Sequence, residues 1–180
     1  MSKNEIVNEN APMLPALLKD LVIAMVIAGA VLYFIRPTIV KQTSMQSTMN
    51  PNDYLIMYRQ AYRSKAPKRG DIIIFKSDLP DEEGKDKLLI KRVIGLPGDE
   101  IQIKNQKVYI NGKKYKENYL KDGYTTGEGT WNVPEALFRD GRQPGGQRGQ
   151  RYTDVGYVDK DQIQGKAVLR LFPFNKIKTF

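Results

Sequence analysis

Residues 90–100 read IKRVIGLPGDE, a short apolar strand that carries one lysine and then turns sharply. Apolar residues flank Lys91 on both sides, and the Pro97-Gly98 pair is typical of a turn. A lysine inside such a strand loses contact with water. Desolvation disfavours the charged ammonium form, and a neutral amine can act as a general base. The alternative is that Lys91 lies on the solvent-exposed face of an edge strand, where its stem covers apolar neighbours.

The composition narrows the possible chemistry. The 180-residue chain contains no histidine and no cysteine, which excludes a Ser-His-Asp triad, a cysteine nucleophile, disulfides and the usual zinc sites. A hydrolase with this composition has few general bases left besides a lysine. With 41% hydrophobic residues, the chain can bury one sizeable core. Its formal net charge of +9 favours anionic partners, and charge alone does not choose between lipid headgroups and nucleic acid.

The N-terminal region predicts a membrane anchor. Residues 1–13 form a short tail, and the apolar residues of 14–35 reach the length that a bilayer requires. We therefore predict a transmembrane helix over residues 14–35, ended by Pro37. The alternatives are the buried helix of a soluble protein and a cleaved signal peptide, although Arg36-Pro37 stands where a small-residue cleavage site should be. The positive-inside rule does not fix the orientation, because basic residues lie on both sides of the run.

The remainder of the chain, residues 36–180, has the patterns of β-strands. Strands are expected at residues 38–40, 54–58, 72–75, 88–94, 100–103 and 107–110. Residues 104–106 should link the last two of these strands as a hairpin, and residues 78–87 should form a charged loop. Because nearly every ordered stretch after the anchor is strand-like, we predict a mainly β fold. It is an antiparallel β-domain preceded by one transmembrane helix.

Two residues of this chain together suit peptide hydrolysis. Ser44 ends an extended segment that follows the anchor, and Lys91 lies in an apolar strand. In such a pair the neutral amine takes the hydroxyl proton as the oxygen attacks a carbonyl. Over essentially its whole length the chain resembles the type I signal peptidases, particularly the short Gram-positive forms. The resemblance is carried by the anchor, Ser44-Met45, RGDIIIF at 69–75, KRVIGLPGD at 91–99 and the closing strands at 156–174.

The resemblance implies a function and its partners. Members of this family are membrane-anchored enzymes that remove signal peptides from exported proteins. The expected partners are therefore signal-peptide-bearing preproteins and membrane lipid, with the β-rich peptidase domain on the extracytoplasmic face of the cell membrane. Neither a cofactor nor a metal is implied, since a serine–lysine dyad needs none.

The resemblance also assigns roles to residues of the first motif. Ser44 corresponds to the nucleophile, its backbone N–H to one oxyanion donor, and Lys91 to the general base. Gln42 stands where the family has a second group at the oxyanion site. Met45 and residues 39–43 correspond to the surface on which the substrate adds as an extended strand. Ser47 replaces the family's usual proline, which we interpret as a tolerated variation in a turn.

One motif of the family is absent. After Pro134 the family has Gly-Asp-Asn-Arg, then a serine, then Asp-Ser-Arg, and these residues contact the lysine and brace the site. This chain instead reads RDGRQPGGQRGQ at residues 139–150. Counting back from Arg151, Gln147 takes the place of the supporting serine and Gly149 that of the bracing aspartate. The supporting box is therefore disrupted at both positions.

A shifted reading frame would account for the disrupted segment. Arg-Asp-Gly-Arg-Gln-Pro can be encoded as CGT GAT GGG AGA CAA CCG, and reading from the next base gives Val-Met-Gly-Asp-Asn-Arg. We hypothesise that two compensating insertions or deletions, in the gene or in its sequencing, produced residues 139–150. The protein sequence permits these codons and permits others as well.

Three functional interpretations remain open. The first is a single-pass membrane serine endopeptidase that uses Ser44 and Lys91. The second is a catalytically impaired relative, or a membrane-tethered binding domain. The third is a peptidase that tolerates the altered segment, with Gln147 donating a substitute hydrogen bond. A Gly/Arg/Gln-rich loop can also bind single-stranded nucleic acid, but this one lacks interleaved aromatic residues, and we expect no nucleic acid as a partner.

Overall fold

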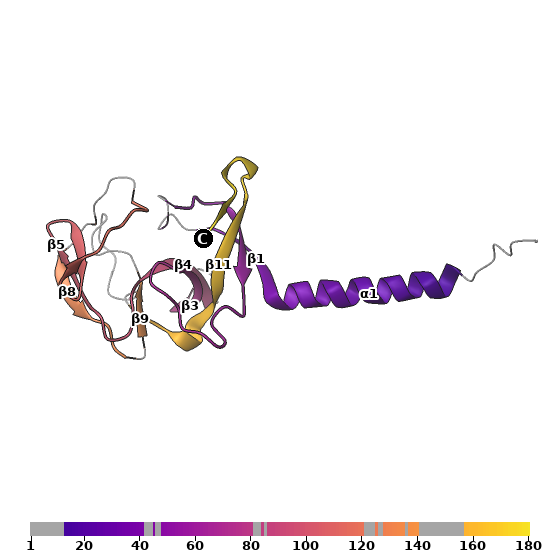
Figure 1. Ribbon diagram of the computed structural model, residues 1–180, viewed down its shortest axis with the longest axis horizontal. Coiled ribbons are helices and arrows are strands. Elements are labelled where there is room, and N and C mark those ends of the chain that lie inside the picture. Colours follow the sequence, from indigo (N-terminus) through magenta and orange to yellow (C-terminus); the bar gives the residue numbers. More distant parts are fainter. Residues whose placement is uncertain are drawn as a thin grey trace, which may run out of the picture. The chain divides into compact units, whose positions relative to one another are not determined.

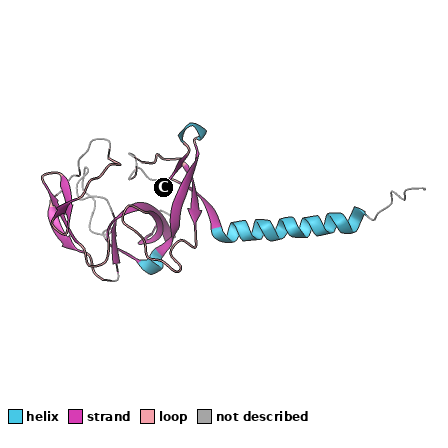
Figure 2. Cartoon of the chain, in the orientation of Figure 1, coloured by secondary structure: helices cyan, strands magenta, loops and turns pink. Residues whose placement is uncertain are grey.

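The computed structural model of the chain describes residues 13–41, 45, 48–80, 84, 86–120, 125, 128–135, 137–140 and 157–180. Within these residues, one helix precedes a domain built almost entirely of strands (Figures 1 and 2). The chain divides into two compact units after Phe34. In order, the elements are α1 (Met13–Phe34), β1 (Ile35–Ile39), β2 (Tyr54–Tyr58), β3 (Ile72–Pro80), β4 (Asp86–Gly95), β5 (Glu100–Lys104), β6 (Lys107–Ile110), β7 (Lys113–Lys114), β8 (Gly129–Asn132), β9 (Leu137–Asp140), β10 (Tyr157–Asp159), η1 (Lys160–Gln162), β11 (Ile163–Phe172), η2 (Phe174–Lys176) and β12 (Lys178–Thr179).

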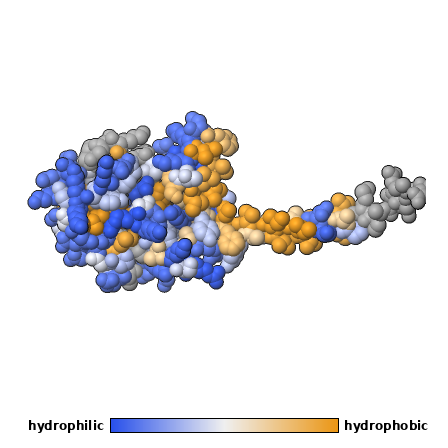
Figure 3. Space-filling model, viewed as in Figure 1, coloured by the Kyte–Doolittle hydropathy of each residue, from blue (hydrophilic) through white to orange (hydrophobic). Residues whose placement is uncertain are grey.

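Helix α1 is apolar along almost its whole length (Figure 3). Its 22 residues extend about 33 Å at 1.5 Å per residue, which matches the hydrocarbon core of a bilayer. The stretch Pro15–Phe34 is long and apolar enough to cross a membrane, and none of it is buried. The apolar helix predicted over residues 14–35 is confirmed, except that Ile35 begins β1. A proline disfavours helical conformation in the residue before it, so the chain leaves the helix ahead of Pro37.

The β-domain consists of two antiparallel sheets. The larger has the order β1-β2-β11-β3-β4-β9-β10, with β12 added beside β11, and the smaller has the order β7-β6-β5-β8. Every pair among the described strands is antiparallel, which confirms the predicted fold class. Strand β4, which carries Lys91, lies between β3 and β9. Strand β4 is therefore an inner strand of this sheet, and β9 pairs with it at Val93 and Gly95, beyond Lys91. This pairing was not visible in the sequence.

Two hairpins differ in how well the sequence predicted them. Between β5 and β6, Asn105 and Gln106 both have positive φ, 51° and 60°, as in the two-residue turn that suits twisted hairpin strands. This hairpin is confirmed. By contrast, part of the predicted charged loop at residues 78–87 belongs to strands, since β3 continues to Pro80 and β4 begins at Asp86. The β3–β4 hydrogen-bond ladder overrides the local preference of these residues for a loop.

Three clusters of buried apolar side chains hold the domain together. The first cluster contains Val40, Met45, Met49, Leu55, Met57, Ile72, Ile74, Ile90 and Ala167. The second cluster contains Ile73, Phe75, Leu89, Val93 and Val158. The third cluster contains Ile94, Ile101, Ile103, Val108, Ile110 and Val133. Successive residues of β3 alternate between the first and second clusters, so this strand is buried on both faces, as its unbroken apolar run predicts.

Gly165 allows a close approach between β11 and β2. A Cβ atom at this position would lie 2.6 Å from the carbonyl oxygen of Tyr58 and 2.8 Å from Cγ of Met57. The β11–β3 register also shifts between Ile163 and Gly165. The sheet can therefore close at this point only where the residue has no side chain.

Replacing Gly165 with alanine is expected to lower the free energy of unfolding of the β-domain by about 1–3 kcal/mol, because the added Cβ overlaps a backbone oxygen. Urea denaturation followed by Trp131 fluorescence measures the change. Gly29→Ala is the control, since a Cβ at Gly29 in α1 meets nothing within 4 Å. Equal stability of Gly165→Ala and the parent protein would contradict the close approach.

Candidate active site

The structure describes two of the six site residues singled out from the sequence, Lys91 and Met45. Ser44, Gln42, Gln147 and Gly149 lie outside the described residues. Within the part of the chain that is described, no group of three or more His, Cys, Asp or Glu side chains could hold a metal ion. Among the described residues, the site is therefore represented by Lys91, Met45 and the residues that contact them.

Lys91 lies in the middle of β4, directly opposite Ile73 of β3. Side chains alternate along a strand, so Lys91 shares a face with Leu89 and Val93, which belong with Ile73 to the second cluster. The Lys91 side chain is half-buried. Apolar side chains therefore shield this amine from part of the solvent, as the sequence of the strand predicts.

Met45 fixes the turn that follows position 44 to the core. Its side chain is only 5% exposed and packs in the first cluster with Val40 and Met49. Its carbonyl oxygen accepts hydrogen bonds from the backbone N–H groups of Thr48, at 2.8 Å, and Met49, at 2.6 Å. This burial gives Met45 a packing role.

Asp53 closes the segment between β1 and β2. The Val40 N–H donates to the Asp53 carbonyl oxygen at 2.9 Å, and the Asn52 N–H donates back to the Val40 carbonyl oxygen at 2.7 Å. The Asp53 carboxylate accepts from the Asn50 N–H at 2.9 Å and pairs with Arg170 of β11 at 3.1 Å. Both members of this ion pair are almost fully buried. Removing one partner would leave an uncompensated buried charge.

Thr48 is held by arginines from two strands. Arg92 Nη2 of β4 donates to Thr48 Oγ1 at 3.2 Å, and Arg170 Nη1 of β11 donates to the Thr48 carbonyl oxygen at 2.9 Å. Arg92 Nη1 also donates to the Gly70 carbonyl oxygen at 2.9 Å, and its guanidinium lies 4.3 Å from the centre of the Tyr119 ring. The turn after Met45 is thus held on one side by the core and on the other by two cations.

The segment Arg69-Gly70-Asp71 contacts the lysine strand through its backbone. The Gly70 N–H donates to the Val93 carbonyl oxygen at 2.7 Å, and the Val93 N–H donates to the Asp71 carbonyl oxygen at 2.8 Å. These bonds are made two residues beyond Lys91. Two motifs that are separate in the sequence therefore meet beside the candidate base.

The Asp71 carboxylate connects this segment to β11. It accepts hydrogen bonds from the Lys166 amine at 2.7 Å and from the Tyr62 hydroxyl at 3.0 Å. Burial by itself would raise the pKa of Asp71, but the hydrogen bonds from Lys166, the Lys68 backbone and Tyr62 outweigh it and lower that pKa. Burial and the Asp71 charge in turn raise the pKa of Tyr62. The phenol therefore stays neutral and acts as a hydrogen-bond donor.

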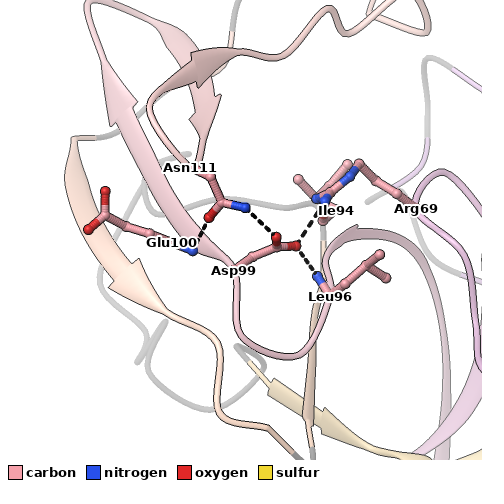
Figure 4. Close-up of polar contacts among 6 residues, drawn as sticks. All are labelled: Arg69, Ile94, Leu96, Asp99, Glu100 and Asn111. Carbon is pink, nitrogen blue, oxygen red and sulfur yellow. Dashed lines mark hydrogen bonds and ion pairs between the residues drawn. The ribbon is translucent and has the colours of Figure 1, made fainter.

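Asp99 organises the turn that follows β4 (Figure 4). Its carboxylate accepts hydrogen bonds from the Leu96 backbone at 2.6 Å and the Asn111 amide at 2.9 Å, and it pairs with Arg69 at 2.9 Å. Arg69 also donates to the Ile94 carbonyl oxygen. Burial by itself would raise the pKa of Asp99, but these hydrogen bonds and the Arg69 charge lower it. One carboxylate thus joins the end of β4 to the smaller sheet.

Four residues form a connected group that local sequence patterns do not predict: Thr48, Arg92, Arg170 and Asp53. One signal could have found Arg170, because it interrupts an apolar strand at residues 167–172 much as Lys91 interrupts its own. A charged side chain inside an apolar strand requires an ion-pair or hydrogen-bond partner, or it takes part in a functional site. Pairing Arg170 with Asp53 would still have required the structure, because 117 positions separate them.

Known proteins resemble this chain over most of its length. The chain matches the family model described as "Signal peptidase, peptidase S26" over residues 14–172. A signal peptidase I of Bacillus licheniformis is 34% identical over 174 residues, which cover 89% of this chain and 89% of that protein. A signal peptidase IB of Staphylococcus aureus is 30% identical over 81% of this chain and 82% of that protein. A crystal structure of a signal peptidase I from Enterococcus faecalis is 26% identical, with a TM-score of 0.44 over 58% of this chain and 98% of that chain.

Asp99→Asn is expected to lower the free energy of unfolding at pH 7 by about 1–3 kcal/mol, because the amide cannot accept all the hydrogen bonds made to the carboxylate. Asp99 has a lowered pKa in the folded state. Its stabilising effect is therefore present above the ordinary Asp value of about 4 and is lost as the pH falls through the folded-state pKa. Urea denaturation at pH 7 and at pH 3 measures both effects.

The parent protein should consequently lose more stability between these two pH values than Asp99→Asn does. Asp161→Asn is the control, because Asp161 is exposed and lies away from the turn, in η1. An equal acid-side loss in Asp99→Asn and the parent would show that the Asp99 contacts carry no charge-dependent stability.

Proposed function

Because this chain belongs to the signal peptidase family, peptidase S26, we propose that it is a membrane-anchored peptidase that removes signal peptides with Ser44 as nucleophile and Lys91 as general base. The observation that carries the proposal is the position of Lys91. Lys91 is half-buried on an inner strand, on the face that also carries Leu89 and Val93. A lysine held in this way, beside a serine, is one of the base and nucleophile pairs that peptide hydrolysis can use.

In the proposed reaction, Lys91 takes the Ser44 hydroxyl proton as the serine oxygen attacks the scissile carbonyl of the preprotein. The Ser44 backbone N–H, together with Gln42, stabilises the oxyanion that forms. The lysine then gives its proton to the leaving amine, and an acyl-enzyme remains. Water activated by the same amine hydrolyses the acyl-enzyme, which restores the serine.

The neighbourhood of position 44 supports this assignment. Met45 is buried in the first cluster, and Thr48 is hydrogen-bonded by Arg92 and Arg170. A nucleophile requires a backbone held by rigid elements, since small displacements of reacting groups lower the rate strongly. We assign Met45 to positioning this turn, with the neighbouring residues 39–43 as the edge to which the substrate strand adds.

The described surface of the β-domain supports contact with lipid. Exposed apolar side chains include Ile39, Tyr54, Phe172, Phe174 and Ile177. Three of them form a row, with ring centres 5.8 Å apart for Tyr54 and Phe172 and 5.5 Å apart for Phe172 and Phe174. Aromatic side chains suit the interfacial region of a bilayer. With α1 as a single-pass anchor, we place the domain on the extracytoplasmic membrane face, where signal peptides emerge.

A second candidate is a catalytically impaired relative that acts as a membrane-tethered binding domain. The observation that favours it is the segment at residues 139–150, where Gln147 and Gly149 replace a serine and an aspartate of the family motif. In the family these two groups support the site, so their replacement in the sequence favours a chain with reduced activity.

Ser44→Ala and Lys91→Ala are each expected to reduce kcat/KM for a signal-peptide substrate by about a thousandfold or more, because each removes one half of the dyad. The assay uses the purified full chain in detergent at alkaline pH. Lys87→Ala is the matched control, since Lys87 is an exposed lysine of the same strand. Full activity of either dyad variant, with Lys87→Ala also active, would overturn the assignment.

The reading-frame hypothesis predicts the DNA sequence of the region that encodes residues 133–152. Sequencing both strands from source material should return Gly-Asp-Asn-Arg and Asp-Ser-Arg in frame. A protein repaired in this way should cleave faster than the chain that carries RDGRQPGGQRGQ, because the lysine regains its supporting serine. If the DNA encodes the present residues and the chain cleaves no substrate, the second candidate function replaces the first.

A further inference from the structure

A pocket of about 590 Å³ opens beside Thr48 in the β-domain. Three cationic side chains line it: Arg92, Arg170 and Lys178. They come from β4, β11 and β12, and Asn118 and Tyr119 form another part of the wall. No acidic residue is among the described residues that line the pocket.

The positive charges of this pocket are only partly compensated. Arg170 pairs with Asp53, but no carboxylate of the described ranges lies within ion-pair distance of Arg92 or Lys178. Arg170 and Lys178 also stand directly opposite each other in the β11–β12 pair. Like charges at directly opposite positions destabilise a sheet. A bound anion would relieve this repulsion.

The two guanidinium groups are held in place before any ligand arrives. Arg92 is fixed by Gly70, by Thr48 and by the Tyr119 ring, and Arg170 is fixed by Thr48 and the Lys176 carbonyl oxygen. A fixed guanidinium loses little further freedom when it binds an oxyanion. Burial also lowers the pKa of Arg92, because it removes water from the charged guanidinium group.

We propose that this pocket binds a phosphate group, held by Arg92, Arg170 and the ammonium group of Lys178. Phosphate presents more acceptor oxygens than a carboxylate, and it carries up to two negative charges, which suits three neighbouring cations. Inorganic phosphate and the headgroup of an anionic lipid share this chemistry. The proposal does not depend on the Ser44–Lys91 assignment, because no step of it involves cleavage.

The pocket also adjoins the candidate active site. Arg92 and Arg170 are the two side chains that hold Thr48, whose N–H bonds to the Met45 carbonyl oxygen. A phosphate held by both arginines therefore acts on the side chains that fix this turn. Occupancy of the pocket is expected to stabilise the folded β-domain.

The test measures thermal unfolding of the full chain in neutral detergent as inorganic phosphate is added at constant ionic strength, with chloride as the balancing anion. A second arm uses nanodiscs of phosphatidylcholine with and without phosphatidylglycerol. Lys178→Gln is the main variant, because Lys178 is exposed and its loss should leave the fold intact. Lys176→Gln is the matched control, since this exposed side chain does not line the pocket and the substitution keeps the backbone carbonyl group that binds Arg170.

We expect phosphate to raise the unfolding temperature in a saturable way. The phosphate concentration that gives half of this effect should be about fivefold higher for Lys178→Gln and unchanged for Lys176→Gln. That result supports the site with free phosphate as its ligand. A response to phosphatidylglycerol alone, again weakened only in Lys178→Gln, supports the site with a lipid headgroup as its ligand. Absence of saturable stabilisation in both arms, or equal responses of the two lysine variants, would overturn the proposal.

Discussion

The carboxylate of Asp99 joins the strand that carries Lys91 to the rest of the domain. It receives hydrogen bonds from Leu96 and Asn111 and the charge of Arg69, and it thereby connects the end of β4, the following turn and the end of β6. Because these contacts outweigh the effect of burial, the pKa of Asp99 is lowered and the group stays ionised. The position of Lys91 depends on this connection, since the amine lies on the strand that Asp99 anchors.

Charged side chains inside apolar strands are the second organising feature. Lys91, Arg92 and Arg170 each interrupt a run of buried residues. The two arginines bond to backbone carbonyl groups, Thr48 and Asp53, but Nε of Arg92 is buried with no hydrogen-bond partner among the described residues. Burying a charged group without a partner lowers the stability of the fold. Such groups are therefore expected where they position a functional site or take part in it. In this domain Arg92 and Arg170 both hold Thr48, whose N–H bonds to the Met45 carbonyl oxygen. Arg92 follows Lys91 directly in β4 and also lines the cationic pocket, so one strand contributes to both the proposed dyad and the pocket.

Much of the fold could be read from local patterns. The apolar run of α1, the alternating residues of β5 and β6 and the apolar strands β2 and β3 were predicted close to their observed positions. The family resemblance, based on short motifs, was confirmed by the match over residues 14–172. The β9 pairing that makes β4 an interior strand was not predicted, and neither was the extension of β3 and β4 into the charged region. Both depend on pairing between strands, which local propensity does not report.

The sequence by itself determined the chemistry that is open to this protein. The lack of histidine and cysteine excludes a Ser-His-Asp triad and a cysteine nucleophile, and the motifs at Ser44 and Lys91 resemble those of the signal peptidases. Only the tertiary structure decided how the motifs support one another. Arg69 reaches Asp99, Asp71 reaches Lys166, and Arg170 reaches Thr48 and Asp53, all across long sequence separations. The physical reason is that an ion pair depends on the distance between its charges in space, and strand register sets that distance.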